Sequence, residues 1–250
     1  MVAAHRKRPR YPIVFMWTVP RSVSTSFERM MSARGDHAVF DEPFSRHYYY
    51  GPRRRSSRFM DELPGSSPAE ILHELESAAR ERPVFVKDMA YQAIDVLDAD
   101  LLQRFRNCFL VRDPAATLPS LADLWPDFTN EEAGWGALAH AADLVTDIGQ
   151  PLAVVEAAEL CRDPVTVVSA WCHAMNLPFV AEALTWEPGM RGEWDLWQEW
   201  HSTTARATGF RDLGEPPAPP TPDQPRVYDA YQRALPVYER LAAQAIRAAG

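Results

Sequence analysis

Short apolar segments rich in β-branched and aromatic residues recur along the first two thirds of the chain. Runs of this length and composition are typical of strands that a parallel sheet buries on both faces. They cover residues 11–17, 37–40, 83–87, 107–111 and 151–156.

The longer segments between these runs carry helix signals. In residues 66–81, Ser67 can cap a helix, Pro68 fits the first turn and Glu70 completes a capping box. A second helix is expected after Asp163, ending before Pro178. Alternating strands and helices predict an α/β fold, with helices flanking a central parallel sheet of about five strands.

The chain has 250 residues, which suits one domain over residues 1–250. Residues 1–10 form a basic tail, and residues 214–225 are proline-dense and predict an extended linker. Residues 226–250 repeat apolar side chains at helical spacing, and Pro236 is expected to kink or interrupt that last helix.

Charge and composition narrow the function. A net charge of −8 argues against a broad nucleic-acid-binding surface, although a local anion pocket is compatible with it. No apolar stretch approaches the roughly 18 residues of a membrane span and no signal peptide is recognisable, so a cytoplasmic protein without membrane partners is expected. Three cysteines without CxxC spacing indicate buried thiols rather than disulfides or a metal site.

The sequence PRSVSTS, residues 20–26, lies between the first strand and the next helix. A helix that begins directly after a strand presents unpaired N–H groups and a partial positive charge, which suit phosphate or sulfate. Arg21 adds a cation that can grip two oxygens, and hydroxyl groups surround the turn. An ordinary capping box of Thr25 and Glu28 is the alternative. The turn comprises Arg21, Ser22, Val23, Ser24, Thr25 and Ser26.

This turn lacks the GxxxxGK[ST] pattern of nucleoside triphosphatases. It resembles instead the 5′-phosphosulfate loop of sulfotransferases that use 3′-phosphoadenosine 5′-phosphosulfate (PAPS). Those loops often carry glycine where this chain has Val23. Because valine disfavours positive φ, the loop is expected to turn with negative φ at Val23; otherwise the match to the family's loop is misplaced.

Two further segments agree with the resemblance in the family's order. In FLVRDPAATLPSL, Arg112 ends a strand and Ser120 follows eight residues later, as in the family's 3′-phosphate signature. An exposed pair of Arg112 with Asp113 is the alternative. A third segment, EPGMRGEWDLW at residues 187–197, is similar to the family's loop for the adenine and a phosphate. Its matching residues are Arg191, Gly192 and Trp194, after Gly189. A turn that only packs against the core is the alternative.

The resemblance implies a P-loop-like three-layer sandwich. It also implies in-line transfer of a sulfuryl group from PAPS to a hydroxyl or amine, a reaction that needs no metal and leaves 3′-phosphoadenosine 5′-phosphate (PAP) as the second product. By analogy with phosphoryl transfer, Arg21 and the loop backbone would stabilise the charged oxygens. Glu42, after the second strand with Asp41, is the expected general base, because an apolar pocket can raise a carboxylate's pKa; a solvated Glu42 beside a capping Asp41 is the alternative.

Other residues compete for catalytic roles. His47 is a rival base, although a histidine near tyrosines is more often structural. Lys87, at the end of the third strand, can contact the bridging oxygen or form an ion pair with Asp88. Asp88 can alternatively serve as the Mg²⁺ ligand of a P-loop kinase, the rival enzyme class, and a non-catalytic nucleotide-binding module is the rival outside enzymes.

The acceptor is expected to be a small molecule. Tyr48, Tyr49, Tyr50, residues 53–55 and Phe59 suggest a loop over the acceptor pocket that would suit an aromatic or anionic acceptor, or else a mobile exposed loop. Trp125, Trp135 and Trp171 are expected in the core or the pocket wall. The sequence does not specify the oligomeric state; a homodimer is one possibility.

Overall fold

The computed structural model describes residues 10–189 and 204–246, and its strands form one five-stranded parallel sheet. The sheet order is β2-β3-β1-β4-β5. The α/β fold with a central parallel sheet is therefore confirmed, and each strand boundary lies within two residues of its expected position. The strands are β1 (Ile13–Thr18), β2 (Ala38–Asp41), β3 (Val84–Met89), β4 (Arg106–Val111) and β5 (Ala153–Glu156).

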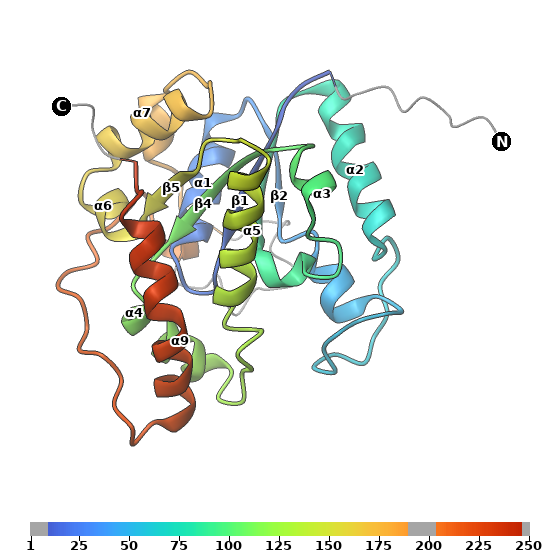
Figure 1. Cartoon of the computed structure of the whole chain (residues 1–250). Helices are drawn as coiled ribbons and strands as arrows, with labels where there is room; N and C mark the ends of the chain where they lie inside the picture. The colour runs from blue at the N-terminus through green and yellow to red at the C-terminus, as the bar shows by residue number, and fades with distance from the viewer. Residues whose placement is uncertain (1–9, 190–203, 247–250) are drawn as a thin grey trace.

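Helices cover both faces of the sheet. Side chains of β1 alternate between two cores: Phe15 and Trp17 face one, Val14 and Met16 the other. Figure 1 shows α5 and α9 in front of the sheet and α1 behind it. The helices that contribute to the first core include α2 (Pro68–Glu81), α3 (Ala99–Leu102), α4 (Pro114–Leu124), α5 (Trp135–Asp147) and α9 (Pro225–Ala242). The second core is covered by α1 (Ser24–Arg34), α6 (Ala157–Arg162) and α7 (Pro164–Ala174).

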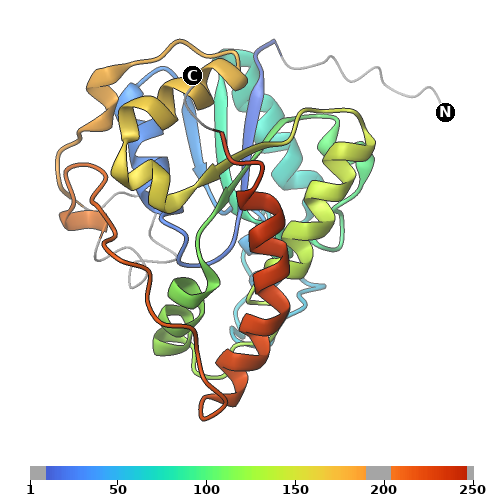
Figure 2. The same ribbon diagram turned by 60° about the vertical axis from the view of Figure 1, so that its left-hand side comes forward.

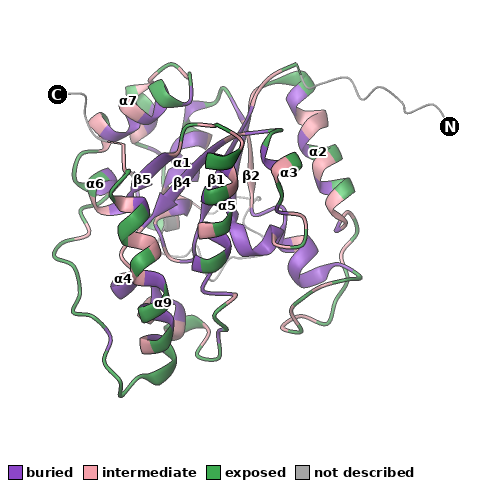
Figure 3. Ribbon diagram, in the orientation of Figure 1, coloured by how far each residue is buried: buried purple, intermediate pink, exposed green. Residues whose placement is uncertain are grey.

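Burial follows this layering. Most strand residues are purple in Figure 3, whereas β2 is pink and the outward faces of the helices are largely green. Trp135 and Trp171 are 3% and 0% exposed and belong to the two cores. Short helical turns complete the described chain: η1 (Arg46–Tyr50), a π-helix, and the 3₁₀ turns η2 (Ala90–Ala93), η3 (Ala181–Leu184) and η5 (Thr204–Arg206).

Most of the expected helix starts are present. Ser67 and Glu70 form the capping box of α2, and Asp163 accepts a hydrogen bond from the backbone N–H of Thr166 at the start of α7. Asp113 caps α4 in the same way, through the N–H of Ala115. In contrast, α1 begins at Ser24, and Val23 at its cap position supplies no side-chain cap.

Pro236 lies inside α9, which continues to Ala242, so the expected interruption is wrong. Proline removes one backbone hydrogen bond. Buried side chains on both sides of it, Tyr231 and Ala234 before and Leu241 after, hold the helix against the first core. Figure 2 shows α9 running alongside α4. Residues 214–224 precede α9 without helix or strand, and their residues are exposed except Pro220.

No helix in the described ranges combines the length and apolar composition needed to cross a bilayer.

Candidate functional site

A pocket of about 310 Å³ opens at the carboxyl ends of the strands. Four strand exits contribute to its wall: the loop after β1, Glu42 after β2, Met89 at the end of β3 and Arg112 after β4. Open α/β sheets bind ligands at this edge, because successive loops there diverge from one crevice.

Residues 20–26, between β1 and α1, form the central wall of this pocket. Val23 has φ +73°, so the expectation of a negative φ is wrong. The valine adopts the left-handed conformation that glycine would favour, and its side chain packs against the second core. Such a backbone costs on the order of 1–3 kcal/mol and persists only where surrounding contacts hold it.

The start of α1 is directed at the pocket. Val23 supplies no side-chain cap to α1, and the Ser26 N–H donates to the Val23 carbonyl (3.0 Å). The residues of this first turn line the pocket, where the partial positive charge of a helix start suits an anion. The alternative capping box of Thr25 with Glu28 does not form, since Val23 occupies the cap position. The Glu28 carboxylate lies instead 3.9 Å from the Nζ of Lys87.

Two arginines from different strands meet beside this helix start. Arg112 donates a hydrogen bond to the backbone oxygen of Arg21 (3.0 Å), and the Arg21 Nε donates to the Ser120 hydroxyl (2.9 Å). Asp113 caps α4 rather than pairing with Arg112. Burial and the proximity of Arg112 lower the pKa of Arg21, although the group stays charged. A doubly charged anion would relieve this repulsion and satisfy both guanidinium groups.

Glu42 occupies the neighbouring wall. Its backbone has φ +46°, and its N–H donates to the Lys87 carbonyl (2.7 Å), which extends the β2–β3 pairing by one residue. Its Oε1 accepts from Lys87 Nζ (2.7 Å) and its Oε2 from Gln92 Nε2 (3.0 Å). The carboxylate is therefore fixed in orientation at the pocket surface, with Glu42 only 7% exposed.

Lys87 lies behind Glu42, with a fully buried side chain. Its ammonium group forms ion pairs with Asp41 and Glu42 and lies 3.9 Å from Glu28. Burial alone would lower the pKa of Lys87, but these three carboxylates raise it well above its ordinary value. These side chains, the Lys87 cluster, comprise Glu28, Asp41, Glu42 and Lys87.

The sequence profile of the sulfotransferase domain family matches residues 13–245, which include every strand and the whole pocket wall. The chain belongs to the sulfotransferase domain family.

Two plant proteins and one solved structure are similar to this sulfotransferase domain. Branched-chain-amino-acid aminotransferase-like proteins 1 and 2 of Arabidopsis thaliana are each 27% identical over 233 residues, 92% of this chain. The chain spans 41% of their length. The sulfotransferase domain of the Synechococcus PCC 7002 olefin synthase has 18% identity and a TM-score of 0.51, over 90% of this chain and 98% of that one. This structural likeness shows the fold.

The structure places three sequence-predicted catalytic residues of this sulfotransferase domain behind or outside the pocket wall. Lys87 is shielded by Glu42. Asp88 accepts hydrogen bonds from the N–H groups of Phe44 and Met89, both at 2.8 Å, so the alternative of a Lys87–Asp88 ion pair is wrong. Successive strand residues point to opposite faces, which separates the two side chains. Burial raises the pKa of Asp88. The Nε2 atom of His47 lies 3.3 Å from the Oδ2 atom of Asp95, and His47 does not line the pocket.

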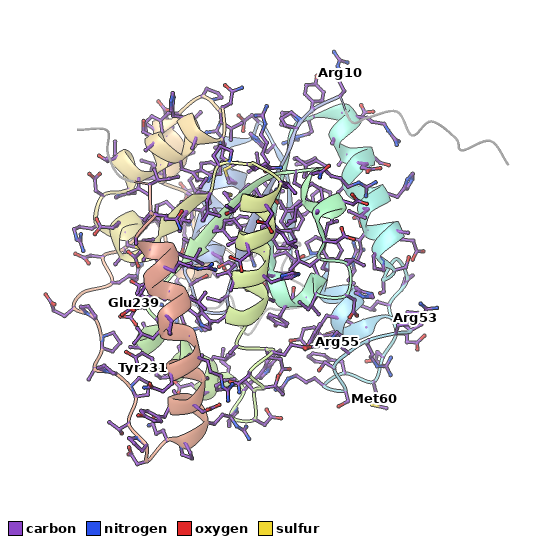
Figure 4. The ribbon with its side chains drawn as sticks, in the orientation of Figure 1. Arg10, Arg53, Arg55, Met60, Tyr231 and Glu239 are labelled. Atoms are coloured by element: carbon purple, nitrogen blue, oxygen red, sulfur yellow. The ribbon has the colours of Figure 1, made fainter. Side chains whose placement is uncertain are left out.

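The tyrosines expected in a loop over the acceptor pocket are found in the core instead. Tyr48, Tyr49 and Tyr50 form η1 and are buried in the first core, because their rings pack on one another and on neighbouring aromatic side chains. Figure 4 shows Arg53, on the following loop, at the edge of the molecule. Arg55 forms ion pairs with Asp95 and Glu131, while Phe59 packs on Tyr49 and Tyr50.

Several lining residues lacked a recognised sequence signal. Tyr91 and Gln92 follow β3, and their position at a strand exit could have identified them. Trp125, in contrast, was expected in the core or the pocket wall, and it lines the pocket. Cys161 and Arg211 come from distant segments that no motif marked. The remaining predicted residues, Arg191, Gly192 and Trp194, lie outside the described residues.

In the described part of the chain, no group of three His, Cys, Asp or Glu side chains is arranged to hold a metal ion. The three carboxylates of the Lys87 cluster surround an ammonium group instead.

Proposed function

We propose that this domain transfers a sulfuryl group from PAPS to a hydroxyl or amine of a small-molecule acceptor. The observation that carries the proposal is the meeting of Arg21, Arg112 and Ser120 at the uncapped start of α1. Family membership supports sulfuryl transfer, and two adjacent arginines suit a nucleotide with phosphates at two positions.

In this proposal the loop of residues 20–26 binds the 5′-phosphosulfate, while Arg112 and Ser120 bind the 3′-phosphate. The N–H groups of α1 and the Arg21 guanidinium then lie beside the oxygens on which charge develops. Each such contact is worth roughly 3 kcal/mol in a transition state.

Glu42 accepts the acceptor's proton. The acceptor oxygen forms a bond to sulfur, the bond from sulfur to the phosphate oxygen breaks, and that oxygen keeps the electron pair as PAP leaves. The Lys87 and Gln92 contacts hold the carboxylate for this transfer. A positioned base of this kind contributes roughly 10²- to 10⁴-fold.

Ligand-induced thermal stabilisation tests the nucleotide assignment. PAP at about 100 times its dissociation constant should add about 2.7 kcal/mol without a metal, whereas AMP and ATP with Mg²⁺ should add less. Arg112→Ala should abolish the preference for PAP over AMP. Arg162→Ala, which breaks an exposed pair with Glu159, should leave it intact.

Each contrary result has a definite meaning. Stronger stabilisation by ATP with Mg²⁺ than by PAP would favour a kinase. An unchanged PAP preference in Arg112→Ala would remove that residue from the site. Glu42→Gln should keep PAP stabilisation but lower sulfate transfer at least about 100-fold; PAP binding without transfer by the wild type would indicate a non-catalytic nucleotide-binding module.

A further inference from the structure

Two neighbouring residues of β3 hold the segment that carries Glu42, one from each face of the sheet. Successive side chains of a strand point to opposite faces. Lys87 extends toward the face covered by α1 and pairs with the Glu42 carboxylate. Asp88 extends toward the first core, where its carboxylate accepts a hydrogen bond from the Phe44 N–H (2.8 Å). The proposed reaction gives Asp88 no role, although its side chain is fully buried.

The chain after β2 follows the end of β3 through three residues. The Glu42 N–H donates to the Lys87 carbonyl (2.7 Å), and Pro43, the next residue, has no N–H to donate. The N–H of Phe44 then donates to the Asp88 carboxylate, so a side chain takes the place of a backbone acceptor. This hydrogen bond ties the turn between β2 and η1 to the end of β3.

The backbone of Glu42 needs support on both sides. Its φ of +46° is uncommon for a residue with a side chain, and a residue before proline favours extended backbone. Such a conformation persists only where surrounding contacts hold it. On the amino side, the pairing of β2 with β3 supplies them. On the carboxyl side, Phe44 is buried in the first core and its N–H is held by Asp88.

The Asp88 carboxylate is itself fixed in orientation. Its second oxygen accepts a hydrogen bond from the N–H of Met89 (2.8 Å), and Met89 lines the pocket as Glu42 does. Loss of the carboxylate would leave the buried Phe44 N–H without this acceptor, and an unsatisfied buried donor favours rearrangement of the chain that carries it. The turn after Glu42 would then move, and the Glu42 carboxylate with it.

We propose that Asp88 is a positioning residue for sulfuryl transfer, which holds the Glu42 carboxylate in place by fixing the turn at Pro43 and Phe44. The inference rests on the proposed function, in which Glu42 accepts the acceptor's proton. Asp88 does not line the pocket and acts only through Glu42. Since a misplacement of about 1 Å can cost about 100-fold in rate, kcat should depend on Asp88 while nucleotide binding should not.

Asp88→Ala, which removes both acceptor oxygens, tests this dependence. Transfer from ³⁵S-labelled PAPS is measured with the best of three acceptors, 2-naphthol, 4-hydroxyphenylethanol and phenylethylamine. The kcat should fall at least about tenfold, with the KM for PAPS and the stabilisation by PAP unchanged. Asp98→Ala is the matched control, because Asp98 accepts the Leu101 N–H (2.8 Å) at the start of α3 and does not line the pocket. It should leave kcat unchanged.

A double variant separates positioning from a general structural role. Because glutamine cannot take the proton, Asp88→Ala should lower kcat less than about twofold in a Glu42→Gln background. Equal losses in the two backgrounds would overturn the proposal, since Asp88 would then act on the rate by another route. An unchanged kcat in Asp88→Ala, or a loss of PAP stabilisation, would overturn it as well.

Amide hydrogen exchange tests the contact without an acceptor. Exchange at Phe44 should be at least about tenfold faster in Asp88→Ala than in the wild type. The Ala38 N–H, which donates to the Pro83 carbonyl (2.8 Å) at the start of β2, should exchange at the same rate in both. Equal exchange at Phe44 in the two proteins would overturn the proposal.

Asp88→Asn provides a second variant with a side chain of the same size. Its one acceptor oxygen can face either N–H, so Phe44 exchange and kcat should both keep their wild-type values or both change. A change in one without the other would overturn the proposal, and so would failure of both variants to fold, which would assign Asp88 to the fold as a whole.

The wild type distinguishes this inference from the proposed function. Sulfate transfer and PAP stabilisation by the wild type, combined with an unaffected kcat in Asp88→Ala, would reject only the role of Asp88. Absence of transfer to all three acceptors, or of PAP stabilisation, would reject the proposed function and this inference with it.

Discussion

Replacing Lys87 with methionine would leave the carboxylates of Glu28, Asp41 and Glu42 together without their shared ammonium group. In the wild type, the Lys87 side chain is fully buried, as are those of Glu28 and Asp41. Methionine keeps most of the apolar volume, so the substitution isolates the loss of charge.

The distances set the size of the effect. At an effective dielectric constant near 20, one ion pair at about 4 Å contributes roughly 4 kcal/mol of attraction. Three carboxylates lie within that range of the Lys87 Nζ, but folding also removes the ammonium group from water. Removing one partner of a buried ion pair costs about 3–5 kcal/mol. We expect a loss in this range for Lys87→Met.

Urea unfolding is the assay, followed by circular dichroism at neutral pH. The midpoint should fall while the slope m stays unchanged, because the folded state keeps its buried surface. Arg55→Met is the control: it breaks ion pairs with Asp95 and Glu131 around a side chain that is 41% exposed, and should cost about 0–1 kcal/mol.

The pH dependence of the free energy of unfolding provides an independent test. Because the wild-type cluster raises the pKa of Lys87, its contribution is fully present below the unfolded value of about 10.4 and is lost as pH rises through the folded value. In Lys87→Met the remaining buried carboxyl groups should bind protons more readily in the folded state than in the unfolded chain. The stability deficit should therefore shrink as pH falls from about 8 to about 5.

A double variant locates the effect in the cluster. Glu28→Gln should restore part of the stability lost in Lys87→Met, because it removes one of three like charges, whereas in the wild-type background it should not stabilise. A loss below about 1 kcal/mol for Lys87→Met, or no coupling to Glu28→Gln, would refute the reasoning.

Two further predictions follow from the backbone and from an exposed ion pair. Since Val23 has φ +73°, Val23→Gly should be more stable than Val23→Ala by about 1 kcal/mol in urea unfolding, opposite to the usual advantage of alanine over glycine; the usual order would contradict the left-handed assignment. The hydrogen bond from Arg55 lowers the pKa of Glu131, so its contribution is present above the unfolded value of about 4.3 and is lost as pH falls. The stability difference between wild type and Glu131→Gln should thus narrow from about pH 6 to about pH 3, and a constant difference would count against that pairing.

The sheet was predictable because its strands other than β2 are buried on both faces. Composition alone marks such segments, and turn residues bound them. The helix starts at Ser67 and Asp163 were predictable for a local reason, since a cap depends on a few consecutive residues. The interruption expected at Pro236 does not occur, because packing on both sides of it, which no local pattern reveals, outweighs the missing hydrogen bond.

The positions of the site residues were predictable to the extent that strand exits share one edge of a parallel sheet. Arg21 and Arg112 meet for that reason. Strand order was not encoded in any local pattern, and it is the adjacency of β2 and β3 that directs Lys87 to Glu42. Alternation along β3 would have separated Lys87 from Asp88, because neighbouring strand residues point to opposite faces.

The expectation of a negative φ at Val23 was wrong for a physical reason that also applies elsewhere in the pocket. In the described chain, the non-glycine residues with positive φ are Arg21, Val23, Glu42 and Asn176, and the first three line the pocket. Each of these three has contacts that can offset backbone strain: Arg21 bonds across to α4, Val23 packs in the second core and Glu42 is held by an ammonium group and an amide. A left-handed conformation supported in this way does not require glycine. The tertiary contacts offset the backbone strain that glycine, which has no Cβ, would avoid. The valine is therefore compatible with an anion-binding loop, and the clustering of strained residues around one pocket is itself evidence that the backbone there is shaped for a ligand.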